Sequence, residues 1–392
     1  MCSIVAWLGA ALVATLPAAN AEAQSARAAR PLAEGMERPL LPSASAWGAS
    51  GNATIRGITI GPIENTYHPA VGYGTEAFSR ALVESRDNGA NWIALTPFGR
   101  VADLSGRGVD PTFEAPHEDN RAAIERSIRW AHELGLKVML VPHLWVESGD
   151  WRALIDPQSE AGWHAWEESY RRFVLAWADV AEREHVELLS AGVELRSWVT
   201  TAHAPSFVRL LRSIRERYHG LLTYSANWDD VETTIPLGEL DLIGINAFYP
   251  LAEKDDADLK TLLEGGARVR ERVHALAEAW KKPVLFTEIG YTTRPNPAVK
   301  PWEWPDKMKN VVVDQKAQAE AYRALLAPFT SEPAFAGFFV WRVYADPDDV
   351  SQEAEWGFSP RKKLAERVMR EVFRTRFETE RNRWFFQALS KP

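Results

Sequence analysis

The chain of 392 residues has one cysteine, Cys2, so it cannot form an internal disulfide. It also lacks the histidine spacings HxH and HExxH, a calcium-binding loop, the nucleophile motif GxSxG, a Walker A sequence and a GxGxxG turn. Without these motifs, the sequence favours a hydrolytic reaction that side chains carry out alone. We therefore predict that the protein uses no cofactor and no metal.

Long basic runs are missing as well, and the net charge is −8, which argues against a nucleic-acid partner. The one N-terminal apolar stretch, residues 4–16, is too short to span a bilayer. Small-x-small cleavage patterns follow it, which favours a signal peptide over 1–23 and export to the periplasm or beyond, although no Lys or Arg precedes the stretch. A disordered apolar leader is the alternative. Residues 24–51, rich in Ala, Pro, Ser and Gly, indicate a flexible linker.

Tryptophan, by contrast, is abundant, with 17 in the chain. From residue 54 onward, short runs of Val, Ile, Leu and Phe alternate with amphipathic segments, and each run is apolar almost throughout, as in a buried parallel strand. The predicted strands are 55–60, 92–96, 137–142, 187–192, 221–225, 240–246, 284–287 and 336–341.

Helical periodicity fills the intervals between these strands. In one example Ile124, Ile128 and Ala131 share a face, with Asp119 as the expected N-cap and Gly135 at the end. Eight such units predict a single (β/α)8 barrel, a TIM barrel, over residues 52–380, and the tail 381–392 is expected to pack on its outside. An open doubly wound sheet is less favoured because the phosphate-binding turn is missing.

Two glutamates, Glu194 and Glu288, stand at the ends of predicted strands four and seven. In a parallel barrel these ends line the mouth where active sites lie. Two facing carboxylates are what glycoside hydrolysis requires, one as acid and one as nucleophile or base. Each could instead be a structural carboxylate, Glu288 paired with Arg56 and Glu194 with Arg196. The spacing alone does not decide which glutamate is the acid.

The sequence resembles glycoside hydrolase family 113, the β-mannanase-like barrels of the retaining glycosidase clan. The resemblance covers about residues 56–374 and depends on an ordered set of segments. These are Arg56-Gly57-Ile58-Thr59, Pro142-His143-Leu144-Trp145-Val146, Gly192-Val193-Glu194-Leu195, Tyr249-Pro250, Thr287-Glu288-Ile289-Gly290-Tyr291 and Trp341.

The resemblance implies that Glu194 is the general acid/base and Glu288 the nucleophile. It also implies that Tyr249 hydrogen-bonds the nucleophile and that Trp341 forms the floor under the sugar being cleaved. Sugar-contact candidates at the strand ends are His143, Trp145, Asn227, Trp228, Asn246, Tyr249, Trp341 and Arg56. Core or loop packing is the alternative for His143, Asn227, Trp228 and Trp341.

One position departs from the clan. Many members have Asn directly before the acid/base, where its amide holds the sugar 2-hydroxyl, and here that residue is Val193, which has no donor. The predicted function is a retaining β-glycoside hydrolase acting on a polysaccharide or oligosaccharide, with β-1,4-mannan favoured by resemblance. The alternatives are a hydrolase of another β-linked glycan and a sugar-binding barrel without catalysis.

Overall fold

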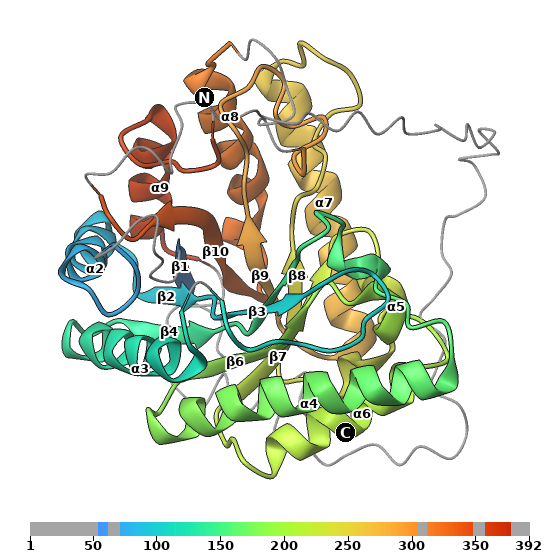
Figure 1. Ribbon diagram of the computed structural model, residues 1–392. Helices are drawn as coiled ribbons and strands as arrows, with labels where there is room; N and C mark the ends of the chain where they lie inside the picture. Colours follow the sequence, from blue (N-terminus) through green and yellow to red (C-terminus); the bar gives the residue numbers. More distant parts are fainter. Residues whose placement is uncertain (1–53, 62–70, 114, 304–311, 348–356, 378–392) are drawn as a thin grey trace, which may run out of the picture. The chain divides into compact units, whose positions relative to one another are not determined.

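The computed structural model describes residues 54–61, 71–113, 115–303, 312–347 and 357–377. Its centre is a closed barrel of eight parallel strands in the order β1-β10-β9-β8-β7-β6-β4-β2 (Figure 1). The strands are β1 (Ile55–Gly61), β2 (Trp92–Leu95), β4 (Lys137–Leu140), β6 (Leu188–Val193), β7 (Leu221–Asn227), β8 (Ile243–Asn246), β9 (Val284–Ile289) and β10 (Phe335–Tyr344). All eight predicted strands are therefore confirmed.

Helices surround the strands in Figure 1. They are α2 (Glu76–Asn88), α3 (His117–Glu133), α4 (Glu160–Arg183), the short α5 (Arg196–Val199), α6 (Ala204–Arg215), α7 (Leu259–Trp280), α8 (Gln315–Leu326) and α9 (Leu364–Arg374). Several begin where the side chain of Thr75, Ser159, Asp258 or Asp314 accepts a backbone N–H of the first turn. None of the described helices has the length and apolar character needed to cross a membrane.

Two local predictions need correction. Helix α3 begins at His117, so Asp119 lies inside its first turn rather than at the N-cap, which is Pro116. The fifth unit has no α-helix, because β7 and β8 are connected through the 3-10 turns η2 (Val231–Thr233) and η3 (Ile235–Glu239). Two more 3-10 turns within the described residues are η1 (Arg152–Leu154) and η5 (Ala327–Ser331).

A small second sheet was not predicted. β3 (Phe98–Val101) follows β2, and β5 (His143–Val146) follows β4, and these two strands pair in parallel beyond the barrel. Pro97 and Pro142 interrupt the runs and separate each barrel strand from its extension. The sheet carries His143 and Trp145 beyond the strand ends.

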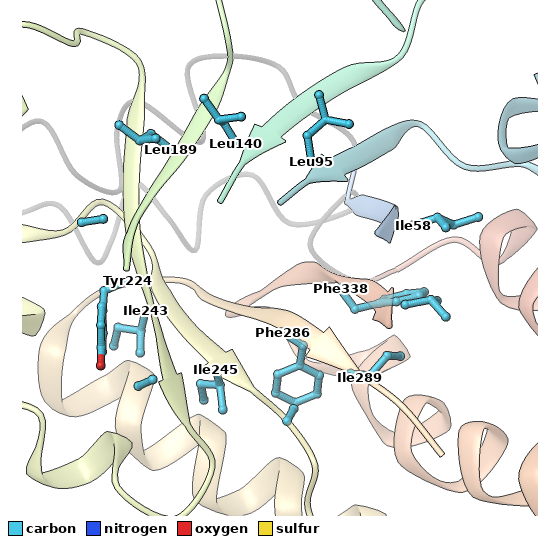
Figure 2. Packing of buried hydrophobic residues seen from close by; sticks show 14 of the residues in the cluster. Ile58, Leu95, Leu140, Leu189, Tyr224, Ile243, Ile245, Phe286, Ile289 and Phe338 are labelled. Atoms are coloured by element: carbon cyan, nitrogen blue, oxygen red, sulfur yellow. The ribbon is translucent and has the colours of Figure 1, made fainter. Parts of the chain in front are cut away.

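Alternating strand residues form two apolar layers. The barrel interior is filled by Ile55, Trp92, Ala94, Met139, Val141, Leu188, Val193, Leu242, Leu285, Ala336 and Phe339. The layer between barrel and helices contains Ile58, Leu95, Leu140, Leu189, Tyr224, Ile243, Ile245, Phe286, Ile289 and Phe338, which Figure 2 shows. The interior is so crowded that a Cβ at Gly57 would lie 2.1 Å from the Phe339 ring. The predicted segments 1–23, 24–51 and 381–392 lie outside the described residues.

Candidate active site

The strands that carry the two glutamates are both irregular just before them. On β6 the register with β7 shifts between Ser190 and Val193, and on β9 the register with β8 shifts so that Glu288, rather than Thr287, lies opposite Asn246. Each shift adds one residue to the glutamate strand, which is a β-bulge. The bulge on β9 lets Ile289 join the helix-facing layer while Glu288 points to the mouth of the barrel.

Glu194 directly follows β6 and has a positive φ of 51°, a conformation that costs free energy in a non-glycine residue. Its side chain is buried and accepts three hydrogen bonds. Trp151 Nε1 and Arg152 Nη1 donate to Oε2 over 2.8 Å and 2.5 Å, and Asn246 Nδ2 donates to Oε1 over 3.0 Å.

A second group of charges holds Trp151 in place. The guanidinium of Arg196 lies 4.7 Å from the centre of the Trp151 ring, and its Nε donates to Asp230 Oδ2 over 2.7 Å. Arg196 also pairs with Asp229. Burial raises the pKa of Asp230 to about 6, and Arg196 opposes that shift. Arg196 is therefore paired with the two aspartates and not with Glu194, whose ion-pair partner is Arg152.

Glu288 is buried at the mouth beside Glu194. Burial and, next, the Glu194 carboxylate raise its pKa to about 8, while Arg152, Arg342 and a hydrogen bond from Asn246 act in the opposite direction. The Asn246 amide thus contacts both carboxyl groups, and its own oxygen accepts a bond from Thr287 Oγ1 over 2.9 Å. Two carboxyl groups joined by one amide form the chemical centre of the site.

His143 and Trp341 lie on the other side of Glu288. His143 Nε2 is 4.0 Å from Glu288 Oε1, and the imidazole stacks at 29° on the Trp341 ring, 6.2 Å between centres. Burial, with Arg152 and Arg342, holds the pKa of His143 well below its ordinary value, so the ring is neutral. The guanidinium of Arg342 lies over Trp341 at 4.9 Å. The structure therefore places His143 and Asn246 beside the glutamates and Trp341 against His143.

Aromatic rings continue from this centre. Phe248, Trp341 and Phe358 form one cluster, and the half-buried Trp228 packs against it. Trp228 stacks at 22° on Trp302, which is 44% exposed. Neighbouring Asn227 donates to Asp229 over 2.9 Å. We call Trp228 and Trp302 the tryptophan pair. The ring of Trp302, the more exposed of the two, presents an apolar face to solvent.

Trp145 is the remaining aromatic candidate at the strand ends. It lies on β5 with 52% of its surface exposed, paired in register with Arg100 of β3. No hydrogen bond joins it to either glutamate within the described part of the chain, and its exposed ring is two residues along β5 from His143.

Two sequence-derived roles do not agree with the structure. The Tyr249 ring packs against Phe286 of the barrel–helix layer with Arg272 over its face, and in the described residues its hydroxyl makes no hydrogen bond to Glu288. The Tyr249 ring also lies 5.6 Å, centre to centre, from the ring of Trp228, so the residue borders the tryptophan pair rather than Glu288.

Arg56 is the second correction. It is the second residue of β1, so it lies at the opposite end of the barrel from the glutamates. Its guanidinium donates to the carbonyls of Thr54 and Thr375 over 3.1 Å and 2.7 Å. Arg56 therefore neither contacts substrate at the mouth nor pairs with Glu288, and it ties the start of β1 to the end of the described chain.

The sequence analysis missed three residues that contact the centre, namely Trp151, Arg152 and Arg342. Trp151 and Arg152 lie at the η1 turn, where no periodicity marks them. Arg342 follows Trp341 directly and would face away from it in a regular strand. The register between β1 and β10 shifts at this point, from Ile58 opposite Val340 to Ile60 opposite Val343. The only available signal was an arginine within an otherwise apolar strand.

No group of three His, Cys, Asp or Glu residues that could bind a metal is found among the residues that the structure describes. The chemistry of the site can be assigned from its side chains. A parallel barrel with two buried carboxyl groups at the C-terminal ends of strands four and seven, bordered by aromatic rings, is the arrangement of a glycosidase.

Comparison with known proteins agrees with this class. The sequence profile of Glycoside Hydrolase Family 113 matches residues 67–357. The β-mannanase AaManA from Alicyclobacillus acidocaldarius is 27% identical, with a TM-score of 0.70 over 82% of this chain and 97% of that one. A β-1,4-mannanase of the same family has a TM-score of 0.71 at 22% identity, covering 83% of this chain and 100% of the other, and shows the shared fold.

A more distant structure, the endoglucanase Cel5A from Pseudomonas stutzeri, has a TM-score of 0.51 at 13% identity over 81% of this chain and 93% of its own. No curated protein matches the chain significantly. The profile match covers most of the sequence, so the chain belongs to glycoside hydrolase family 113. The protein is a glycoside hydrolase, and its substrate is a carbohydrate.

Proposed function

We propose that the enzyme hydrolyses β-1,4-mannan or manno-oligosaccharides with retention of configuration. The observation that carries the proposal is the pair of carboxyl groups, Glu194 and Glu288, joined by the Asn246 amide in a buried site. The similarity to β-mannanases favours mannan as the substrate.

In the proposed mechanism Glu194 protonates the glycosidic oxygen while Glu288 attacks the anomeric carbon and forms a glycosyl–enzyme ester. Glu194, now ionised, then takes a proton from water, whose oxygen attacks the same carbon and releases Glu288. The roles follow the strand positions, Glu194 after β6 and Glu288 in β9, the fourth and seventh strands of the barrel. His143 and Trp341 would border the sugar that is cleaved.

Val193 belongs to the barrel interior and cannot hold the sugar 2-hydroxyl. That contact contributes several kcal/mol to transition states in this class. Another donor must therefore supply it, or turnover will be slow. Hydrolysis of another β-glycan remains the second candidate, and a barrel that binds sugar without catalysis is the third.

A panel of aryl β-glycosides and soluble β-mannan, glucan and xylan separates these candidates. The proposal expects cleavage of mannan and of aryl β-mannosides, with the β-anomer as the first product in proton NMR. An α-anomer would overturn retention, cleavage of only a different glycan would overturn mannan as substrate, and binding without cleavage would favour the third candidate.

Azide identifies the role of each glutamate. Glu194→Ala should retain activity on a dinitrophenyl glycoside, whose leaving group needs no protonation, and azide should accelerate it and yield the β-glycosyl azide. Glu288→Ala should be inactive without azide. An α-glycosyl azide from the Glu194 variant would show that the roles are reversed.

We further propose that the enzyme is exported, because the apolar segment 4–16 is followed by small-x-small sites. Mass spectrometry of the N-terminus after expression with the segment in place tests this. An intact N-terminus on cytoplasmic protein would contradict export.

A further inference from the structure

Within the described residues, every hydrogen bond to the carboxyl group of Glu194 comes from outside its own strand. Trp151 Nε1 and Arg152 Nη1 donate to Oε2 from the η1 turn, and Asn246 Nδ2 donates to Oε1 from β8. An indole has a single N–H, so the direction of the Trp151 ring decides whether its bond to Oε2 can form. The contacts that fix this ring therefore also fix one side of the Glu194 carboxyl group.

Arg196, the first residue of α5, lies over the Trp151 ring. Its guanidinium carbon is 4.7 Å from the ring centre. The electron-rich face of an indole attracts a cation, and the planar guanidinium can stack on it. Trp151 is only half-buried and 30% of the Arg196 side chain is exposed, so water competes for the guanidinium. Other contacts are needed to keep it over the ring.

Two consecutive aspartates after β7 provide those contacts. Arg196 Nε donates to Asp230 Oδ2 over 2.7 Å, and Arg196 Nη2 pairs with Asp229 Oδ1. The aspartates are themselves held by Asn227, whose amide donates to Asp229 Oδ1 over 2.9 Å and whose carbonyl accepts the Asp230 N–H over 3.1 Å. Because the two carboxylates bond to different nitrogens, the plane of the guanidinium is fixed relative to this loop.

Asp230 is an expensive residue to keep for stability alone. Its side chain is buried, and within the described residues its Oδ1 has no hydrogen-bond partner. A buried carboxyl oxygen without a partner costs free energy that a neutral residue would avoid. The arrangement is explained if the carboxylate serves to hold Arg196 at the edge of the site.

We propose that Arg196 is a positioning residue for the acid/base Glu194. Held by the two aspartates, the guanidinium fixes the Trp151 ring so that the indole N–H points at the carboxyl group. Arg196 itself has no hydrogen bond to Glu194 in the described part of the chain, so it acts through the ring. The catalytic consequence rests on the proposed function, while the link between Arg196 and the indole bond does not.

The consequence concerns the step in which a proton is donated. A general acid must lie within hydrogen-bond reach of the oxygen that it protonates. If the Trp151 ring is free to turn, Glu194 Oε2 keeps only its bond from Arg152, and the carboxyl group is less firmly directed. Substrates whose leaving group needs a proton should then react more slowly, and substrates whose leaving group needs none should be spared.

Nitrogen-15 NMR of the tryptophan indole groups tests the link without any substrate. Trp151→Phe assigns the signal, because it removes one indole N–H. In the wild-type protein we expect the Trp151 N–H at a hydrogen-bonded shift and in slow exchange with deuterium oxide. In Arg196→Met the signal should move upfield and exchange at least about tenfold faster, because the ring is no longer held.

Arg172→Met is the matched control, because Arg172 is 65% exposed on α4 and pairs with Glu168 over 3.4 Å. It should leave the Trp151 signal unchanged. Arg196→Met exchange that equals the control would overturn the proposal. If Arg196→Met does not fold, Asp229→Asn provides the comparison, since it keeps the shape of the side chain and removes one ion pair; exchange equal to the control would again overturn the proposal.

The kinetic test compares kcat/KM on phenyl β-mannoside and on dinitrophenyl β-mannoside. Arg196→Met should lower the value about tenfold for the phenyl substrate and change it by less than about twofold for the dinitrophenyl substrate. An equal loss on both substrates would show a general structural role or a direct contact with the sugar, and either would overturn the proposal. If the wild type hydrolyses no glycoside, the proposed function fails, and the NMR result still decides whether Arg196 holds the indole bond.

Discussion

Replacing Glu288 with Gln should make the protein more stable, and increasingly so as the pH rises. Glu288 has a pKa of about 8 in the folded chain against an ordinary value of 4.5. Below pH 4.5 the carboxyl is neutral in both states, so the Gln variant gains nothing. Between pH 4.5 and 8 the unfolded chain ionises while the folded chain keeps the proton, and wild-type stability falls by about 1.4 kcal/mol per pH unit.

The magnitude follows from the same numbers. At pH 7 the Gln variant should exceed the wild type by about 3 kcal/mol in unfolding free energy, and above pH 8 by a constant value of about 5 kcal/mol. For a barrel of this size about 2 °C in Tm accompanies each kcal/mol, which gives about 6 °C at pH 7. An amide fits the site because it presents the same shape as the protonated carboxyl.

Thermal unfolding followed by circular dichroism at pH 4.5 and pH 7.5 measures the effect. Glu168→Gln is the matched control, because Glu168 is 47% exposed on α4 and its substitution should change stability by less than about 0.5 kcal/mol. A Tm gain that is the same at both pH values, or no gain at pH 7.5, would refute the reasoning. A gain together with lost turnover would show that the buried carboxyl is maintained for activity at the expense of stability.

Three further outcomes are expected. Trp151→Phe removes the 2.8 Å bond to Glu194 and should lower kcat about tenfold with KM nearly unchanged, whereas an unchanged kcat would contradict a role in orienting Glu194. Trp302→Ala should raise KM for long oligosaccharides about fivefold and leave an aryl monosaccharide unaffected, measured by initial rates; equal effects on both would argue against a sugar platform. Gly57→Ala should destabilise the fold by about 2–3 kcal/mol in denaturant titration because the new methyl would overlap the Phe339 ring, whereas Gly238→Ala, whose methyl would lie 3.5 Å from the Trp280 ring, should not.

The barrel was predictable from the sequence because its strands are apolar on both faces. Runs such as 284–287 and 336–341 do not alternate between apolar and polar residues. An almost continuous apolar run of this length predicts a parallel strand that is covered on both faces. The fifth helix was not predictable in the same way: the interval between β7 and β8 contains Pro236 and Gly238, and the structure forms only 3-10 turns there. Glu194 and Glu288 were found because a carboxylate at the end of an apolar run is costly without a function.

The partners of the glutamates could not be found that way. Trp151 and Arg152 are contributed by a loop, where side-chain direction follows from tertiary contacts and not from periodicity. Tyr249 was assigned as a partner of the nucleophile by analogy, and the structure packs its ring between Phe286 and Trp228 instead. The hydrogen bond of Arg152 to Glu194 joins two residues 42 positions apart, and no one-dimensional pattern marks it.

The bulges explain why the site requires departures from regular strand geometry. With strict alternation Glu288 would share the face of Phe286, which packs against the helices, and Ile289 would point into the barrel. The extra residue on β9 exchanges these two directions, so that Glu288 points to the mouth and Ile289 to the helices. On β6, the bulge and the positive φ of Glu194 together direct the Glu194 side chain to the mouth. The carboxyl pair thus depends on a bulge in each of the two strands and on a strained backbone at Glu194, and the closely packed barrel interior supports this geometry.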